Sequence, residues 1–282
     1  MSTCTKRWMI SLLIITNLFS LAISQYEAFF CSQNGNYTKE SLYRADLNSL
    51  LNSLSSNIDN TGFYSASVGQ ANAIALCRAD IQHNTCQGCV NIVAKEILGI
   101  CPNQYQAVMW YEFCMVRYSN DNITGRLAIS PGTYSYNRNN MTSPGSFKVV
   151  REELMDDVRA RAANGGPLRK AAVGNRTGPD DQEIFALLQC TPDLSPVNCS
   201  RCLVQATQYI SALVNDTIGI RLYTPSCLYR YEPSQFYNDT RLEEPLTPPL
   251  APPLVSSPPP PPPPPLLPFP PPPGNHSLIK DK

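Results

Sequence analysis

The sequence predicts an α+β fold built twice, as two tandem domains, and two observations carry this prediction. A pattern of four cysteines occurs twice, and each cysteine of the second copy follows its counterpart in the first at one constant distance along the chain. A repeat of this length indicates tandem domains. Each copy also combines two segments with apolar residues at helical spacing and several short segments rich in aromatic and β-branched residues. We therefore expect, in each domain, a disulfide-stapled antiparallel sheet with two helices packed on one face.

The repeated cysteine pattern is C-x8-C-x2-C, with a fourth cysteine that follows the third at the same distance in both copies. Its members are Cys77, Cys86, Cys89 and Cys114 in the first copy and Cys190, Cys199, Cys202 and Cys227 in the second. The first copy has two further cysteines, Cys31 and Cys101, whereas the second copy has Val214 where Cys101 would lie. Because a bridge is lost as a pair, we infer a disulfide between Cys31 and Cys101.

The four shared cysteines allow three pairings, and the sequence leaves all three open. One of them follows if Cys77 ends a strand while Cys86 and Cys89 lie in the first turn of a helix. The eight-residue loop then closes as Cys77–Cys86 and leaves Cys89 for Cys114. The same logic applied to the second copy gives the pairs Cys190–Cys199 and Cys202–Cys227.

Residues 1–24 have the features of a secretory signal peptide: the basic pair Lys6-Arg7, an apolar run and small residues before Gln25. We expect cleavage after Ser24, because polar residues interrupt the run and it is shorter than the ~20 apolar residues of a membrane span. The alternative is an uncleaved anchor helix. Cleavage also removes Cys4 and leaves ten cysteines. An even number fits an oxidising, secretory route.

The charge of the mature chain argues against nucleic acid as a partner. Loss of the two basic residues of the leader leaves 20 basic against 22 acidic residues, a formal charge of −2. The sequence shows no basic stripe, which nucleic-acid binding would require.

Residues 25–128 form the first repeat in this interpretation. Strands are expected at 63–68, 71–78, 107–111 and 113–118, where aromatic and β-branched residues gather. Helical spacing predicts a first helix whose core face comprises Leu42, Leu47, Leu50, Leu51 and Leu54. A second helix is expected over 85–98, closed by Gly99, with the buried stripe Cys89, Ile92, Val93, Ala94 and Ile97. His83 is expected to be a solvated loop residue.

Residues 133–240 form the second repeat. Its first helix is marked by Val150, Leu154 and Val158, and its strands are expected at 184–190, 218–223 and 228–231. The second helix is marked by Leu203, Val204, Thr207, Ile210 and Val214. This repeat has one disulfide fewer, and each bridge typically contributes ~2–4 kcal/mol. We therefore expect it to be the less stable repeat.

The composition changes abruptly in residues 241–282. This segment holds 18 of the 27 prolines, including an unbroken run of eight over 258–265. Proline at this density predicts a solvated polyproline II rod, ~3.1 Å per residue, and a stiff spacer is the favoured interpretation. The sharper alternative is attachment to the cell wall, because the Ser-Pro block at 256–265 resembles those of plant extensins.

Eight Asn-x-Ser/Thr acceptor motifs lie in the mature chain. Seven are glycosylation candidates: Asn36, Asn122, Asn140, Asn175, Asn215, Asn238 and Asn275. The eighth, Asn198, directly precedes Cys199, and the neighbouring bridge disfavours its use.

The sequence offers no enzymatic chemistry. It contains two histidines, and it lacks a phosphate-binding loop, a nucleophile elbow and a metal-spaced cluster of His and Glu. The Cys86-x2-Cys89 pair could form a redox site or half of a zinc site, but with partners at fixed distances in a secreted chain a structural bridge is favoured. We expect no catalytic residue, no cofactor and no metal.

Three segments beyond the cysteines make the chain recognisable: CSQNGNYT at 31–38, CMVRYS at 114–119 and CLYRYEP at 227–233. With the cysteine spacing, they resemble the ginkbilobin-type cysteine-rich repeat, or stress-antifungal domain, of land plants. Two repeats in one chain resemble the ectodomains of cysteine-rich receptor-like kinases, the cysteine-rich repeat secretory proteins and the plasmodesma-located proteins. The resemblance covers about residues 25–240. It implies the same five disulfides as the pairing above.

The receptor-like kinases continue from such a proline-rich stretch into a membrane span and a kinase, whereas this sequence stops at Lys282. A secreted product and a truncated receptor ectodomain both fit that ending. With the leader cleaved, we expect no membrane span.

The resemblance also implies one ligand site, because ginkbilobin-like antifungal members hold mannose with an asparagine, an arginine and a glutamate. At the matching positions, the first repeat has Ser32, Val108 and Ser119, so we expect no such site there. The second repeat keeps Arg221 and Glu232 but lacks the cysteine from which the asparagine would be assigned. The plain interpretation of this remnant is a surface Arg–Glu ion pair between adjacent strands.

These expectations define a secreted, non-enzymatic recognition module of the plant apoplast in stress or defence signalling, with an extracellular protein or carbohydrate as its ligand. The alternatives are a mannose-type antifungal lectin and a structural protein that contacts the cell wall through residues 241–282. Because two ligand groups without the asparagine leave part of a sugar's polar surface unpaired, we expect no measurable mannose binding.

Overall fold

The computed structural model describes residues 26–139, 141, 143–213, 217–243 and 246. Both repeats belong to one unit, which ends at Pro248. Several predictions of the preceding section lie outside the described residues: the signal peptide over 1–24, the proline run over 258–265, Val214, and the acceptor sites Asn140, Asn215 and Asn275.

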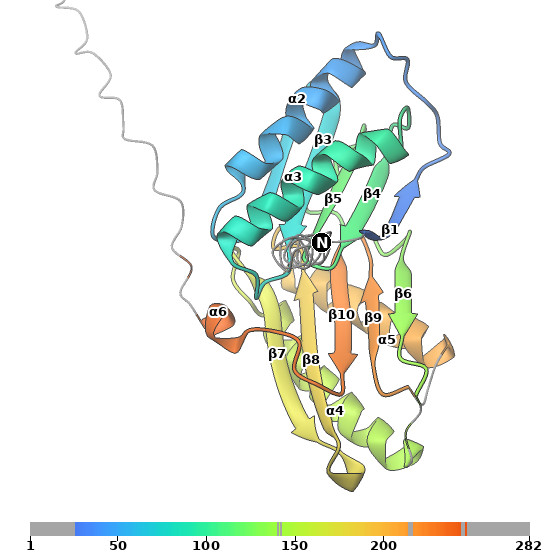
Figure 1. Ribbon diagram of the computed structural model, residues 1–282, viewed down its shortest axis with the longest axis vertical. Helices are drawn as coiled ribbons and strands as arrows, with labels where there is room; N and C mark the ends of the chain where they lie inside the picture. Colours follow the sequence, from blue (N-terminus) through green and yellow to red (C-terminus); the bar gives the residue numbers. More distant parts are fainter. Residues whose placement is uncertain (1–25, 140, 142, 214–216, 244–245, 247–282) are drawn as a thin grey trace, which may run out of the picture. The chain divides into compact units, whose positions relative to one another are not determined.

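The first repeat is a five-stranded antiparallel sheet with the order β1-β4-β5-β3-β2. Its strands are β1 (Tyr26–Cys31), β2 (Phe63–Val68), β3 (Ala71–Cys77), β4 (Ala107–Tyr111) and β5 (Cys114–Ser119). Helices α2 (Leu42–Asn57) and α3 (His83–Ile100) lie side by side over one face of this sheet (Figure 1).

The second repeat has the same plan, with the order β6-β9-β10-β8-β7. Its strands are β6 (Thr133–Tyr136), β7 (Lys170–Thr177), β8 (Glu183–Cys190), β9 (Ile220–Tyr223) and β10 (Cys227–Glu232). Helices α4 (Pro144–Ala163) and α5 (Pro196–Leu213) cover one face, and the short helix α6 (Asp239–Glu243) follows the last strand.

The helices form where a polar cap and an apolar stripe coincide. The Ser41 side chain accepts a hydrogen bond from the Arg44 amide and caps the start of α2. Its core face comprises Tyr43, Leu47, Leu50, Leu51 and Leu54. The prediction that Leu42 belongs to this face is wrong: Leu42 is 76% exposed, because the first residue of the helix points away from the stripe.

Helix α3 differs from its prediction in three details. It begins at His83 rather than Thr85, so His83 is half-buried in a helix and not in a solvated loop. It runs one residue past Gly99, to Ile100. Ile92 is exposed, because a 3.6-residue period places Val90, Val93 and Ile97 on the buried stripe instead.

Five disulfides staple the two repeats, and none joins one described repeat to the other. They link Cys31–Cys101, Cys77–Cys86, Cys89–Cys114, Cys190–Cys199 and Cys202–Cys227. These are the pairs that the resemblance implies. The local reason is partly the expected one: β3 ends at Cys77 and Cys86 lies in the first turn of α3, whereas Cys89, expected in the same turn, lies in the second.

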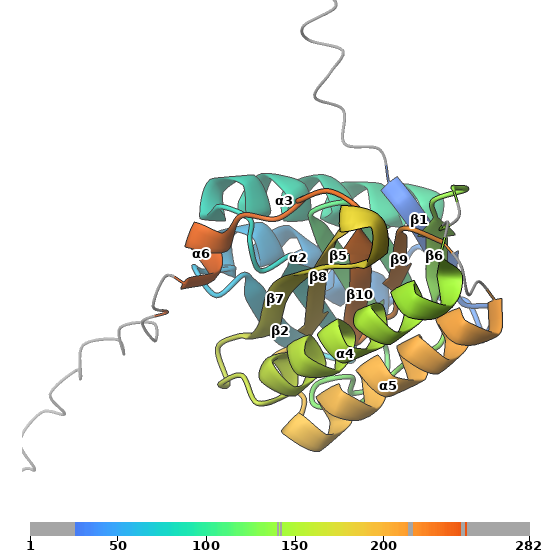
Figure 2. The ribbon, with the colours of Figure 1, turned by 90° about the horizontal axis from the view of Figure 1, so that it is seen from below.

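Each sheet is buried on both faces, which sequence periodicity did not predict. The face under the helices forms the main core of its own repeat. The opposite faces of the two sheets share a third core, which includes Ile74, Leu76, Val108, Trp110, Met115, Leu187, Tyr223 and Leu228. In Figure 2 the helices of the two repeats accordingly lie on opposite sides, with the sheets between them.

Five described elements were missed by the sequence prediction: β1, β6, β7, α6 and the short 3-10 helix η2 (Pro179–Asp181). The three strands are edge strands of their sheets. An edge strand packs on fewer neighbours, which weakens its sequence pattern, although the fourth edge strand, β2, was predicted to the residue.

Candidate functional site

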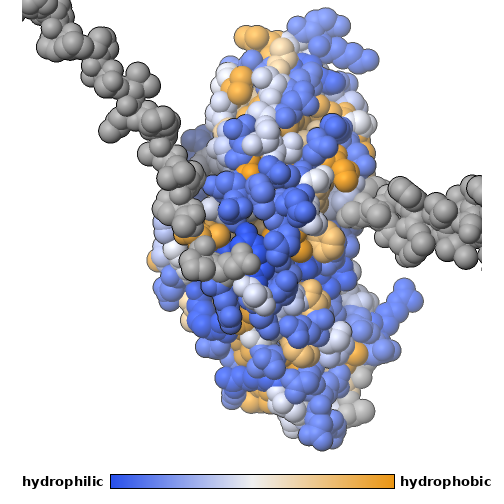
Figure 3. All heavy atoms as spheres, turned by 60° about the vertical axis from the view of Figure 1, so that its left-hand side comes forward, coloured by the Kyte–Doolittle hydropathy of each residue, from blue (hydrophilic) through white to orange (hydrophobic). Residues whose placement is uncertain are grey.

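The face shown in Figure 3 is mostly hydrophilic, with its hydrophobic residues in separate small groups. Single apolar residues on a surface need no functional explanation. Among the described residues, charged side chains cluster where the two repeats meet. We call this region the junction.

Glu112 is the centre of this junction. It lies in the turn between β4 and β5, and its carboxylate reaches three guanidiniums. Its Oε1 lies 2.6 Å from Arg78 Nη1 and 2.6 Å from Arg230 Nη1, and its Oε2 lies 2.7 Å from Arg221 Nη1. Arg78 belongs to the first repeat, whereas Arg221 on β9 and Arg230 on β10 belong to the second. One carboxylate therefore bridges the repeats.

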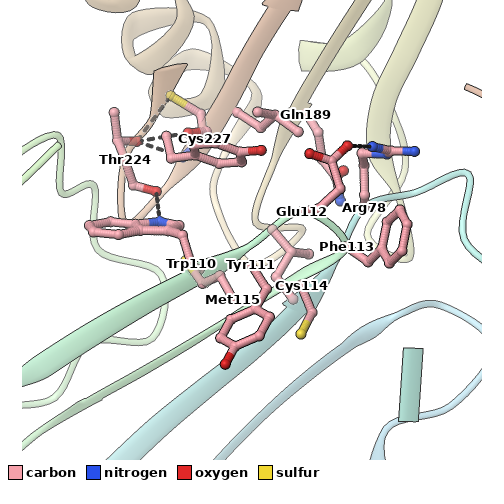
Figure 4. A pocket seen from close by; sticks show the side chains of 13 residues that line it. Arg78, Trp110, Tyr111, Glu112, Phe113, Cys114, Met115, Gln189, Thr224 and Cys227 are labelled. Atoms are coloured by element: carbon pink, nitrogen blue, oxygen red, sulfur yellow. Dashed lines mark hydrogen bonds and ion pairs between the residues drawn. The ribbon is translucent and has the colours of Figure 1, made fainter. Parts of the chain in front are cut away.

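Arg78 is fixed on several sides. Asp80 accepts from its Nε at 2.6 Å and from its Nη2 at 2.9 Å, which is a bidentate pair. The guanidinium carbon also lies 5.3 Å from the Phe113 ring centroid, and Figure 4 shows Phe113 beside Arg78. On the second repeat, Arg230 lies 4.0 Å above the ring centroid of Phe236. Such cation–π contacts add to the ion pairs where the charges are desolvated.

The neighbouring arginines determine the ionisation state of Glu112. Burial by itself would raise the pKa of Glu112, but Arg230, Arg221 and Arg78 outweigh burial and lower the pKa below its usual value. Glu112 is thus an anion that holds three cations together. Burial and the neighbouring Glu112 raise the pKa of Tyr223 to about 12, so that its phenol stays neutral.

Polar contacts to the main chain complete the junction. The Gln189 side chain accepts from the Ala79 amide at 2.9 Å and donates to the Cys77 carbonyl at 2.8 Å. On the other side, Trp110 Nε1 donates to the Thr224 carbonyl at 3.3 Å, a contact drawn in Figure 4. Between these contacts lies a cavity of about 30 Å³. It is too small for a ligand, so the junction is a structural joint.

A larger hollow of about 190 Å³ opens beside the joint, in the second repeat. Asn137, Gly219, Arg221 and Glu232 are among its lining residues. The structure therefore brings the two predicted residues, Arg221 and Glu232, to one site. Their direct contact is weak, since Arg221 Nη2 lies 3.9 Å from Glu232 Oε1.

Asn137 is the residue that the sequence analysis missed. In the first repeat Cys31 pairs with Ala107 across the sheet, and in the second Tyr136 pairs with Ile220, which is the counterpart of Ala107 at the constant offset of the repeat. Tyr136 thus occupies the place of Cys31, and Asn137 occupies the place directly after it. The expectation that the second repeat has no assignable asparagine is wrong, because only sheet register could align the segments without the cysteine.

Local structure holds these groups in place. Asn137 Oδ1 accepts from the Asn139 amide at 2.9 Å, and the Asn137 amide donates to the Gly219 carbonyl at 2.8 Å. A Cβ at Gly219 would lie 2.5 Å from Glu232 Oε2, so a side chain there would displace the carboxylate.

Arg221 and Glu232 form the expected ion pair between adjacent strands, at 3.9 Å, and this pair belongs to a larger network. Arg221 Nη1 is bound to Glu112 and, at 3.1 Å, to Glu27 of the first repeat. Glu232 accepts instead from Arg230 Nε at 3.0 Å. The hollow is thus built into the junction network, and repeat one supplies two of the carboxylates around its arginine.

The corresponding residues of the first repeat are packed away from solvent. Ser32, Val108 and Ser119 are all buried, with at most 5% of their surface exposed. Val108 packs in the core shared by the two sheets.

Within the described ranges, no group of three or more His, Cys, Asp and Glu residues is arranged to hold a metal ion. No described helix is both long and apolar enough to cross a membrane. The four described glycosylation candidates are exposed: Asn36, Asn122, Asn175 and Asn238.

Comparison with known proteins agrees with the geometry. A family model described as salt stress response/antifungal matches residues 30–121 and 133–234. Cysteine-rich receptor-like protein kinase 25 of Arabidopsis thaliana is 36% identical over 246 residues, which cover 81% of this chain and 36% of that protein. Cysteine-rich receptor-like protein kinase 26 of the same plant is 36% identical over 230 residues, which cover 79% and 35%. The chain thus spans about a third of the length of these relatives.

Two solved structures have the same fold. The tandem DUF26 ectodomain of the Arabidopsis thaliana cysteine-rich receptor-like protein PDLP8 matches with a TM-score of 0.65 at 22% identity, over 74% of this chain and 98% of that one. The corresponding ectodomain of PDLP5 matches with a TM-score of 0.55 at 23% identity and the same coverage. The predicted α+β fold in two disulfide-stapled repeats is confirmed.

Proposed function

Because the chain belongs to the salt stress response/antifungal family, we propose that it is a secreted, non-enzymatic recognition module of the plant apoplast, acting in stress or defence signalling. The matched region amounts to about a third of the length of the receptor-like kinases. Its fold matches that of the solved tandem ectodomains of PDLP8 and PDLP5.

The observation that carries the proposal is the joint between the repeats. Buried ion pairs that are bound on several sides fix the relative orientation of the elements they join. With Glu112 bound to arginines of both repeats, the repeats are held in one relative orientation and would meet a ligand as a single unit. Glycans on the exposed sites Asn36, Asn122, Asn175 and Asn238 would restrict the ligand to the faces between them.

A carbohydrate ligand is the second candidate, and the position of Asn137 favours it. Asn137 supplies amide donors and an acceptor, Arg221 supplies a fork of donors and Glu232 supplies acceptors. All three line one hollow of about 190 Å³, a size suited to one monosaccharide. Arg221 Nη1 is engaged by Glu112 and Glu27, whereas Nη2 lies 3.9 Å from Glu232, the nearest ion-pair partner that it has among the described residues. Nη2 is therefore the donor that a sugar hydroxyl would use.

Two measurements on the glycosylated mature chain test these candidates. Affinity capture from apoplastic fluid identifies a protein ligand, and capture should be lost when Glu112→Ala loosens the joint. Calorimetry with mannose tests the hollow: the carbohydrate candidate requires saturable binding that vanishes in Asn137→Ala and in Glu232→Ala, and such binding would overturn the sequence-based expectation of no measurable mannose binding. Arg176→Ala, which removes an exposed ion pair with Glu153, is the matched control. No mannose binding by the intact chain would remove the lectin candidate and leave the recognition module standing.

Contact with the cell wall through residues 241–282 is a separate proposal that rests on their proline content. Extraction of the protein from walls by salt, compared between the native chain and a variant with residues 258–265 replaced by Gly-Ser repeats, decides it. Equal extraction of both would reject wall attachment.

A further inference from the structure

Three exposed tyrosines gather at one edge of the second repeat. Tyr134 and Tyr136 project from β6, and Tyr209 projects from α5, with 38%, 49% and 50% of their surface exposed. The rings of Tyr134 and Tyr136 are nearly parallel, 18° apart with centroids separated by 6.3 Å. Tyr209 meets the edge of Tyr134 at 5.7 Å. We call these three residues the tyrosine ladder.

The ladder is specific to the second repeat. Tyr136 stands at the register position of Cys31, and Tyr209 is the counterpart of Glu96 at the constant offset of the repeat. In the first repeat these positions hold a bridged cysteine and an acidic side chain. All three tyrosines lie outside the described core clusters. Their partly exposed rings therefore do not serve the packing of the core.

A groove of about 680 Å³ adjoins the ladder at Tyr209, which is one of its lining residues. It runs between α5 and the segment before β6, and Pro131, Gln205, Gln208 and Tyr209 are among its lining residues. None of the described residues that line it is charged. Its polar side chains supply amide and hydroxyl donors over an apolar floor, which suits an uncharged ligand rich in acceptors.

We propose that the tyrosine ladder and this groove bind a proline-rich segment of another extracellular polypeptide in the polyproline II conformation. Such helices dock in aromatic-lined grooves, and their carbonyls remain free to accept hydrogen bonds because proline has no amide hydrogen. Tyr134 and Tyr136, with nearly parallel rings 6.3 Å apart, and the neighbouring Tyr209 supply the aromatic surface against which such a helix packs.

The neutral lining selects the occupant. A charged peptide would leave its charges without partners in the groove, whereas an uncharged proline-rich chain loses little hydration there and arrives already extended. This sequence itself contains such an uncharged segment, the run of eight prolines over 258–265, and a second molecule with a run of this kind would supply the ligand.

The site shares Tyr136 with the lining of the hollow at Asn137, whereas Tyr134 and Tyr209 are not among the residues that line that hollow. Successive side chains of a strand point to opposite faces. Ser135 and Asn137 lie on the face of Arg221, whereas Tyr134 and Tyr136 lie on the face of Leu222 and Ile220, under the helices. Substitution of Tyr134 or Tyr209 therefore tests the ladder and leaves the lining of the hollow unchanged.

The experiment measures fluorescence anisotropy of a labelled dodecapeptide, SSPPPPPPPPLL, with the full mature chain. We expect saturable binding, weakened about 10-fold by Tyr134→Ala and by Tyr209→Ala, because buried aromatic anchors dominate such interfaces. Tyr136→Phe, which keeps the ring, should bind within about threefold of the native chain. The matched control is Phe30→Ala on β1, an equally exposed ring on the corresponding edge strand of the first repeat, which should change nothing.

Circular dichroism and thermal unfolding of each variant establish that it is folded, which the exposure of the three rings leads us to expect. A peptide with alternate prolines replaced by glycine should bind at least about 10-fold more weakly, since it loses the preformed extended conformation. Equal binding of both peptides, or undiminished binding by the triple tyrosine variant, would overturn the proposal. Displacement of the peptide by a neutral oligosaccharide at lower concentration would assign the ladder to a glycan instead. Binding seen solely after residues 258–265 are replaced by Gly-Ser repeats would overturn the assignment to a second molecule.

Discussion

The carboxylate of Glu112 lies 2.7 Å from the guanidinium of Arg221, although 109 positions separate the two residues in the chain. Glu112 belongs to the first repeat and Arg221 to the second, where it lines the hollow at Asn137. A residue of one repeat thus orients a residue of the candidate site in the other. This relationship leads to the first two predictions.

Glu112→Gln should destabilise the described unit by about 2 kcal/mol. Removing one partner of a buried ion pair leaves the other charges uncompensated, and three arginines depend on this carboxylate. The cost is below that of a fully buried pair, because the Glu112 side chain is 24% exposed. Urea unfolding measures the change. Glu153→Gln, at an exposed pair with Arg176, should cost less than about 0.5 kcal/mol. Equal costs for both variants would show that the joint contributes no special stability.

The stabilisation by Glu112 should depend on pH. The folded-state pKa of Glu112 is lowered, so its ionised form stabilises the folded chain above the ordinary glutamate pKa of about 4.3. This contribution is lost as the pH falls through the folded-state pKa. We expect the difference in unfolding free energy between the native chain and Glu112→Gln to be constant from pH 6 to 7 and to shrink below about pH 4. A difference that grows on acidification would contradict this assignment.

Gln189→Ala should weaken the contact between the repeats locally, at the Ala79 amide. The Gln189 side chain bonds the Ala79 amide and the Cys77 carbonyl, and its loss leaves both main-chain groups without these partners. Each buried unsatisfied group costs about 1–3 kcal/mol. Hydrogen exchange of the Ala79 amide should therefore become faster, whereas amides in the centre of α2 should not change. Gln70→Ala, at an exposed position, serves as the control.

The core of the first repeat should discriminate between two leucines of the same helix. Leu50 is 1% exposed and Leu42 is 76% exposed. Leu50→Ala should cost about 2–5 kcal/mol through the cavity it creates. Leu42→Ala should stay within about 0.5 kcal/mol of the native chain. Thermal unfolding checks both variants, and a large effect at Leu42 would mean that a neighbour covers this residue in solution.

Peptide mapping without reduction should recover five linked pairs, each within one repeat. No peptide should link a residue below 115 to one above 189, because every disulfide lies inside its own sheet-and-helix layer. One inter-repeat bridge in the native protein would be incompatible with this arrangement.

The sequence by itself determined the duplication, the four long helices α2 to α5 and most of the strands. The constant spacing of Cys77, Cys86, Cys89 and Cys114 in both copies required one local geometry twice, since a disulfide tolerates little variation in the distance between its ends. Periodic leucines then located α2, and β-rich segments located β2 and β4 to the residue. These signals are local, and local spacing is what a sequence records most directly.

Only the tertiary structure decided the site. The position of Asn137 depends on how β6 pairs with β9, and no cysteine marks that register in the sequence. The ion pairs between the repeats could not be predicted from the sequence either, because the residues that form them are not repeated. The counterpart of Arg221 is Val108, and the counterpart of Glu112 is Pro225. Charges that meet across 109 positions are set by the packing of two sheets. The free energy of that packing comes from long-range contacts, which leave no periodic trace in the chain.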